Sequence, residues 1–245
     1  MEGNKTTFID VICNHAMVEI ADLRLENDMN ISPARFFRKM ALYMIQAIPR
    51  FNRPPEAREW LKFTAPVYDD YDYTVPGDYS SGDLTIETGM TGFDMASVIK
   101  IQPNGTGTYD FISIPVAQYN AETGDVVVPN AYVNNGDHFS VDFYTDGYFE
   151  RELGFDVKDI LGMLIQYVWE CRFANDFLLQ QPKIKDRSFD VGNEANHMRA
   201  STERMKYLSE RNNQRLKAFE QSVAYRNTVL EGNTSTGYTY APENT

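Results

Sequence analysis

The chain has 245 residues, long enough to bury a hydrophobic core without disulfides or structural metals. Its composition, 42% hydrophobic and 24% charged, argues against wholesale disorder and against an integral membrane protein. The net charge of −12 would repel a phosphate backbone, so long-range electrostatics give no support to general nucleic-acid binding. No apolar run approaches the roughly 20 residues of a membrane-spanning helix. The N-terminus lacks the basic residues and following apolar stretch of a secretion signal, so we expect the protein to be made and used in a reducing cytoplasm.

The acidic excess is confined to the middle of the chain. Residues 64–150 carry fourteen Asp or Glu and a single Lys or Arg. Residues 1–63 carry eight acidic and nine basic residues, and residues 151–245 carry thirteen of each. The sequence therefore predicts a strongly acidic segment set between two nearly neutral ones.

The first neutral segment has the periodicity of helices. Apolar residues from Phe8 to Leu25 recur at steps of three and four, which predicts one amphipathic helix. A second helix should begin at Ser32-Pro33, where the Ser32 hydroxyl can cap free N–H groups and Pro33 can take the first helical position. Its expected buried stripe is Phe36, Phe37, Met40, Met44 and Ile48. Prolines should end that helix, and a short helical piece should follow from Glu56 to Leu61.

The acidic segment changes to a period of two, which is typical of strands. Apolar positions alternate in 97–101, 112–114 and 139–143, and Gly and Asn recur between these runs in patterns typical of tight turns. We expect about five short strands in a small antiparallel sandwich or barrel.

Helical character returns at Phe155. Asp156 can cap the new helix, and Asp159, at the third helical position, can accept a hydrogen bond from the backbone N–H of Asp156. Phe155 can pack on Ile160 as a hydrophobic staple. The helix should run past Trp169 to about Leu179 and is apolar on nearly all sides, as expected for the centre of a bundle.

A longer and more charged helix should run from about Asn193 to Val229. Its expected stripe is Met198, Met205, Leu208, Leu216, Phe219 and Val223. Residues 233–245 are rich in Asn, Thr, Ser, Gly and Tyr and have no periodicity, so we expect them to become ordered only on a partner.

These elements predict an α+β protein. A helical bundle with a long C-terminal helix should be interrupted by an inserted antiparallel β-rich domain. The expected divisions are 1–63 for the first helical part, 64–150 for the insertion, 151–232 for the second helical part and 233–245 for a flexible tail.

The sequence offers little for catalysis or metal binding. Its three histidines, at positions 15, 138 and 197, have no second ligand at a standard spacing. Glu194 and His197 match the Glu-x-x-His step of di-iron bundles, which needs a second such pair that the chain lacks. The run from Asp69 to Tyr73 lacks the spacing of a calcium loop, and we expect a solvated acidic loop there. With no phosphate loop, nucleophile elbow or dinucleotide fingerprint, the prediction is a protein that is not an enzyme and uses no cofactor.

Three stretches of the helical parts, in this order, resemble the head-to-tail connector proteins of tailed bacteriophages, also called adaptors or neck rings. They are Arg35-Phe36-Phe37 with Ala47-Ile48-Pro49-Arg50-Phe51, Phe155 to Leu161 with Trp169, and Asp186 and Phe189 with Glu194 to Ala200. The family has an Ala-Ile-x-x-Phe turn, a Phe-Asp-Leu-Thr-x-x-Glu-Ile cap before a buried helix, and a long terminal helix. Here Val157-Lys158 stand for Leu-Thr and Asp159 for Glu. The resemblance covers about 150 residues.

The resemblance implies a ring of identical copies, commonly twelve, stacked beneath the portal protein. Such a ring extends the DNA channel and presents a platform to the next tail or neck ring protein, at the head-tail interface of the virion. DNA would pass without specific binding, and no membrane would be involved. Aromatic residues among small flexible ones mark Tyr238, Tyr240 and Pro242 as anchors for docking on the portal. We expect the acidic insertion to line the channel, to make ring contacts or to meet the next tail ring.

Two alternatives stay open. The chain could be another neck or tail ring component. It could also carry a binding module, in which the β-rich insertion recognises a carbohydrate or a host surface through exposed aromatics such as Tyr71, Tyr73, Tyr79 and Tyr144. An enzyme built on scattered carboxylates is the least favoured reading.

Overall fold

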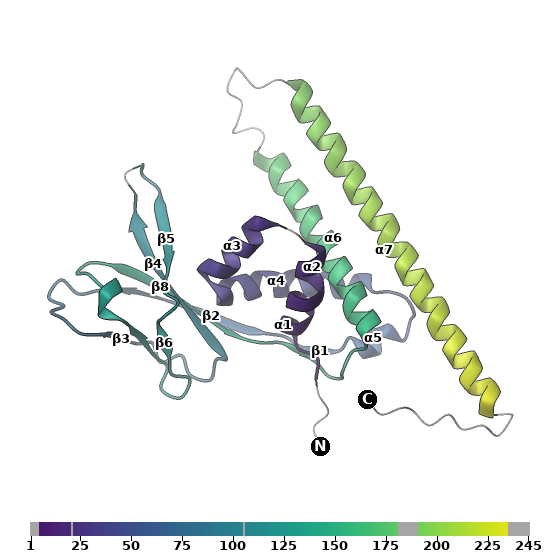
Figure 1. Ribbon diagram of the computed structural model, residues 1–245, viewed down its shortest axis with the longest axis horizontal. Coiled ribbons are helices and arrows are strands. Elements are labelled where there is room, and N and C mark those ends of the chain that lie inside the picture. Colours follow the sequence, from purple (N-terminus) through teal and green to yellow (C-terminus); the bar gives the residue numbers. More distant parts are fainter. Residues whose placement is uncertain (1–4, 21, 105, 181–190, 235–245) are drawn as a thin grey trace.

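The computed structural model describes residues 5–20, 22–104, 106–180 and 191–234. The fold is α+β, with a group of helices beside a unit of antiparallel strands and a long C-terminal helix along the far side of the helices (Figure 1). We call the helices that precede this long helix, together with the short strands β1 and β9, the helical body. The strands β2 to β8, residues 67–145, form the β-unit.

The prediction of one continuous helix from Phe8 to Leu25 is wrong. The chain forms α1 (Phe8–Val11), a π-helical turn η1 (Ile12–Ala16), α2 (Met17–Glu19) and then a separate helix α3 (Leu23–Ile31). Helical geometry ends at Ile20, and Asp22 begins α3 by accepting a hydrogen bond from the backbone N–H of Arg24. Leu23, one of the apolar residues of the predicted stretch, lies after this break and is 80% exposed.

The second predicted helix is confirmed. Helix α4 (Pro33–Ala47) begins with Pro33 in its first turn, and the Ser32 hydroxyl accepts a hydrogen bond from the N–H of Arg35 at 3.3 Å. The predicted stripe is buried, except that Ile48 is only half-buried. A 3-10 turn η2 (Ile48–Arg50) and the short helix α5 (Ala57–Trp60) follow.

Two further helices follow the β-unit in the chain. Helix α6 (Phe155–Gln180) packs against α4 and the π-helical turn, and α7 (Val191–Thr234) runs beside α6 (Figure 1). With 44 residues, α7 is about 66 Å long at 1.5 Å per residue. Leu208, Leu216 and Phe219 are buried on its predicted stripe, whereas Met205 and Val223 are half-buried.

The close approach of α6 to the N-terminal segment depends on Gly162. A Cβ atom at Gly162 would lie 2.8–3.0 Å from the backbone and Cβ of His15. These contacts are shorter than any side chain tolerates, so glycine allows α6 to lie directly on the π-helical turn.

The β-unit consists of two antiparallel sheets. The larger has the order β2 (Val67–Thr74), β8 (His138–Thr145), β4 (Met95–Pro103) and β5 (Tyr109–Ser113). The smaller has the order β3 (Leu84–Glu87), β7 (Asp125–Val128) and β6 (Gln118–Tyr119). A 3-10 turn η3 (Asn130–Tyr132) precedes β8. The prediction left open a sandwich or a barrel. Both sheets contribute to one hydrophobic cluster, so the β-unit is an antiparallel sandwich, with more strands than expected.

Strand β8 is buried on both faces. Its predicted inward residues Phe139, Val141 and Phe143 lie in the core of the β-unit. The residues between them are buried as well, because the opposite face of β8 packs on α4. Tyr144 belongs to the core of the helical body, so the two cores meet across this strand.

The chain enters and leaves the β-unit at one place. Strand β1 (Phe63–Thr64) on the way in pairs with β9 (Tyr148–Phe149) on the way out. The N-terminal segment joins this pair, since Phe8 donates its N–H to the Gly147 carbonyl and Phe149 donates to Thr6, both at 2.8 Å.

Candidate functional site

The β-unit meets the helical body through a buried carboxylate. Asp142 on β8 is 4% exposed and accepts a hydrogen bond from the Ser32 hydroxyl at 2.8 Å. Arg35 donates from Nε and Nη2 to the other oxygen of Asp142, at 3.3 and 3.0 Å. Beside them, the N–H of Ala34 donates to the Ser97 hydroxyl of β4 at 3.0 Å. We call Ser32, Arg35, Ser97 and Asp142 the joint.

The joint satisfies groups that would otherwise be costly to bury. The first N–H groups of a helix lack acceptors within the helix. Here Ser97 of β4 accepts from one of them, and Asp142 of β8 orients the Ser32 hydroxyl that accepts from another. A carboxylate at a helix N-terminus is also favoured by the helix dipole. Because the Asp142 contacts depend on direction as well as distance, the joint holds the β-unit at one angle to the helical body.

A second contact ties the end of β8 to the start of α1. Asp146 accepts hydrogen bonds from the N–H of Ile9 and from the hydroxyl of Tyr144, both at 3.1 Å. Burial raises the pKa of the Asp146 carboxyl above its ordinary value, and burial likewise raises the pKa of Tyr144. Removal from solvent therefore disfavours the charged form of both groups.

The surface of the β-unit and its flanks is acidic. Its single cation, Lys100, is buried, pairs with Asp137 at 2.5 Å and donates to the Tyr132 carbonyl. Exposed carboxylates of residues 64–150 are Asp69, Asp70, Asp72, Asp78, Asp83, Glu87, Asp94, Asp110, Glu122 and Glu150. The cation therefore neutralises a partly buried carboxylate and leaves the outer surface strongly negative.

The run from Asp69 to Tyr73 was predicted as a loop and is instead part of strand β2. It is the edge strand of the larger sheet, and its acidic side chains are exposed. Arg38 of α4 contacts Asp70 at 3.7 Å and lies over the Tyr68 ring at 3.9 Å from its centre. Charged side chains on an edge strand discourage unwanted strand pairing, which gives this acidic run a structural role.

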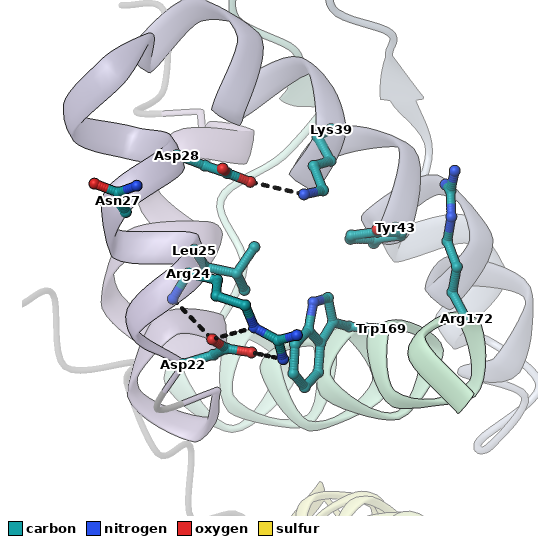
Figure 2. Close-up of a pocket in the computed structure, with 9 residues that line it drawn as sticks. All are labelled: Asp22, Arg24, Leu25, Asn27, Asp28, Lys39, Tyr43, Trp169 and Arg172. Atoms are coloured by element: carbon teal, nitrogen blue, oxygen red, sulfur yellow. Dashed lines mark hydrogen bonds and ion pairs between the residues drawn. The ribbon is translucent and has the colours of Figure 1, made fainter. Parts of the chain in front are cut away.

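A polar pocket of about 550 Å³ lies between α3, α4 and α6 (Figure 2). Two of its cations already contact carboxylates, since Arg24 binds Asp22 at 2.7 Å and Lys39 binds Asp28 at 2.8 Å. The hydrogen bonds from Arg24 lower the pKa of Asp22. The Trp169 and Tyr43 rings and Arg172 complete its lining. Because both of its carboxylates pair with cations of the pocket, we interpret it as a polar contact region between helices and not as a reaction centre.

An aromatic pocket of about 520 Å³ lies where α5, the first turn of α6 and α7 meet. Trp60 and Phe219 pack edge to face with ring centres 6.2 Å apart, and Val157 and Val223 line the same hollow. Asp156 and Arg226 stand at 3.8 Å from each other in its wall. The pocket therefore combines apolar walls with a few polar groups, as binding pockets do.

Several polar contacts link helix α7 to the body. Arg211 donates to both Glu19 and Gln166 at 2.9 Å, and Arg204 pairs with Glu170. Burial raises the pKa of Glu170, and Arg204 opposes that shift. Ion pairs that are this exposed contribute little stability each, so the apolar contacts of α7 carry most of its attachment.

The predicted start of α6 differs from the structure. The helix begins at Phe155, two residues before the start that an Asp156 cap implies, and the Gly154 carbonyl accepts from the N–H groups of Val157 and Lys158. Phe155 is 73% exposed and lies edge-on to His15, so it makes no staple with the buried Ile160. The contact of Phe155 with His15 therefore takes the place of the expected contact between Phe155 and Ile160.

The two carboxylates predicted for that cap lie near the start of α6 and contact α7. Asp159 and Asp156 reach Arg215 at 3.4 and 3.8 Å. Trp169, predicted at the centre of the bundle, is partly buried against the body core.

The aromatic residues proposed for a binding module are largely packed. Tyr144 is fully buried, and Tyr71, Tyr73 and Tyr79 pack against the core of the β-unit. The side chains of Glu194 and His197, and of the residues predicted as portal anchors, Tyr238, Tyr240 and Pro242, lie outside the residues whose side chains the structure describes.

Within the described residues, no group of three or more His, Cys, Asp or Glu side chains is placed to hold a metal ion. No helix in the described part of the chain is long and apolar enough to cross a membrane. Comparison of the chain with family models, curated proteins and solved structures finds no match.

Sequence reasoning missed the joint and the aromatic pocket. The joint was missed because Asp142 has the pattern of an exposed polar residue in a strand of alternating polarity. The aromatic pocket was missed because Trp60 and Phe219 lie far apart in sequence. One signal was present, since the Ser32 cap and Pro33 predicted a helix N-terminus in need of partners.

Proposed function

We propose that the chain is a structural virion protein, a head-to-tail adaptor that forms a homo-oligomeric ring between the portal and the tail of a tailed bacteriophage. The ring extends the DNA channel, and its neighbours are the portal protein and the next neck or tail ring. The resemblance of the helical segments motivates this proposal.

The observation that carries it is that two different surfaces lie on opposite sides of the helical body. An acidic β-unit is fixed to a nearly neutral helical body by the buried joint, while α7 lies along the opposite side of the body (Figure 1). A ring subunit needs this arrangement, because it must hold two neighbours and a passing polymer in constant relative positions. An acidic surface next to DNA would repel the backbone and prevent sticking.

The test uses the full chain and a portal protein encoded by the same genome. Purified portal rings are mixed with the chain and imaged by electron microscopy, and we expect a second ring beneath the portal. A parallel sample uses the chain ending at residue 232, which should bind the portal weakly if Tyr238 and Tyr240 are anchors. Normal binding by the shortened chain removes the tail from the proposal, and the absence of any added ring with the full chain removes the adaptor function.

The placement of the acidic surface is tested in the same images. We assign the β-unit first to the channel lining, then to ring contacts, then to the next tail ring. Density for the β-unit on the outer surface of the ring would eliminate the channel lining.

A carbohydrate or host-binding module on a helical anchor is the second candidate. The packing of Tyr71, Tyr73 and Tyr144 weakens it, because stacking on sugars needs exposed rings. Binding of the full chain to a glycan array would favour it over the adaptor.

A further inference from the structure

The aromatic pocket at the foot of α7 is open although its walls are apolar. Phe155 at its edge is 73% exposed, and Trp60 and Val223 are only half-buried. Exposed aromatic surface beside a hollow of about 520 Å³ favours an occupant, because covering it removes apolar area from water.

The chain itself supplies a suitable occupant. Residues 235–245 follow directly on α7 and contain Tyr238 and Tyr240 between small residues. Tyrosine suits such a pocket, since its ring can pack against other rings while its hydroxyl reaches the polar rim. Glu243 in the same segment could approach Arg226, which is the cation at that rim.

The length of the chain permits this contact within one molecule. The pocket is lined by Asn227, and α7 ends at Thr234, seven residues later. That distance is about 10 Å along a helix, whereas an extended chain from Thr234 to Tyr240 reaches about 20 Å. The segment can therefore turn back along α7 and reach the pocket.

We propose that the aromatic pocket formed by Trp60, Phe155, Val157, Phe219 and Val223 receives Tyr238 or Tyr240 of the same chain before assembly. This inference rests on the proposed adaptor function, in which the same residues dock on the portal. The pocket then stores the portal anchor, and the portal must displace it from the pocket. Because the tyrosine and the pocket would cover each other, free chains would not associate through these aromatic side chains.

The chain offers a direct reporter of this contact. It has two tryptophans, Trp60 in the aromatic pocket and Trp169 in the polar pocket between α3, α4 and α6. A Trp169→Phe background leaves Trp60 as the reporter, and a Trp60→Phe background gives the matched control. The measurements are emission wavelength and iodide quenching of the full-length protein, with and without Tyr238→Ala and Tyr240→Ala together.

In the Trp60 reporter, we expect the double tyrosine substitution to shift the emission to the red and to increase the quenching constant. The Trp169 reporter should be unchanged. A peptide of residues 235–245, added at about millimolar concentration to match the effective concentration of a short tether, should restore the shielding of Trp60. The same peptide with both tyrosines replaced by alanine should not.

Three results would overturn the proposal. Trp60 could be equally quenched with and without the tyrosines, both reporters could change together, or the shielding could disappear on dilution, which would show that a second copy supplies the segment. These outcomes are separate from the portal test. A chain that shields Trp60 yet binds the portal normally without residues 233–245 would keep the pocket contact and lose the docking role.

Discussion

The helical body holds the β-unit and α7 in different ways. At the joint, a carboxylate that is 4% exposed is saturated by Ser32 and Arg35. Along α7, apolar burial is confined to a few residues of one stripe, and most polar contacts are half-exposed ion pairs. Buried and directional contacts fix an orientation, whereas exposed ion pairs exchange easily with water and salt. The β-unit should therefore behave as part of the frame and α7 as an arm that can be released.

Substitution of the joint carboxylate should have the largest effect. Asp142→Ala leaves the Ser32 hydroxyl and Arg35 without their partner, and we expect a loss of about 3 kcal/mol in the free energy of unfolding. The value lies at the low end of the usual range because Arg35 is half-exposed and can turn to water. Denaturant titration measures it. The control is Asp70→Ala, whose exposed pair with Arg38 should contribute less than about 1 kcal/mol. Equal losses in the two variants would remove the distinction between joint and surface.

The next largest effect should come from the α7 attachment. Leu216→Ala removes a buried side chain from the stripe that holds α7, with an expected loss of about 2 kcal/mol. Hydrogen exchange should show faster exchange along α7 and unchanged protection in β8. Tyr225→Ala, at a 72% exposed position of the same helix, should have little effect. If protection in β8 fell with that in α7, the two attachments would belong to one cooperative unit.

A smaller effect should come from the contact between α6 and the π-helical turn. Gly162→Ala forces a Cβ against His15, and we expect a net loss of about 1 kcal/mol after the better helix propensity of alanine is counted. Thermal unfolding measures it. Gly77→Ala is the control, because a Cβ there meets no atom within 4 Å. A Gly162→Ala protein as stable as the control would mean that α6 can move away from the turn without cost.

The smallest expected effect is a pH dependence at Asp146. Its folded pKa is raised by burial, so the folded state holds this proton more tightly than the unfolded state does. The stabilisation is fully present below the unfolded pKa of about 4 and is lost as pH rises through the higher folded value. The stability advantage of the natural protein over Asp146→Asn should therefore shrink with rising pH in parallel denaturant titrations. An advantage that grows with pH would show that the hydrogen bonds from Ile9 and Tyr144 outweigh burial.

The sequence predicted those elements whose cause is local. The Ser32 cap and Pro33 predicted where α4 starts, and apolar periodicity predicted the stripes of α4 and α7. Turn residues and a period of two predicted the antiparallel β-unit. The charge count placed the acidic excess in residues 64–150, and the structure adds that the single cation there is buried.

Only the tertiary structure decided what packs against each face. Asp142 is buried because α4 covers the second face of β8, which a period of two cannot reveal. The first predicted helix breaks where Asp22 caps a new one, and Phe155 turns to His15 instead of Ile160. Helix and strand formation depend on neighbours in sequence, whereas burial, the joint and the aromatic pocket depend on residues brought together from distant segments.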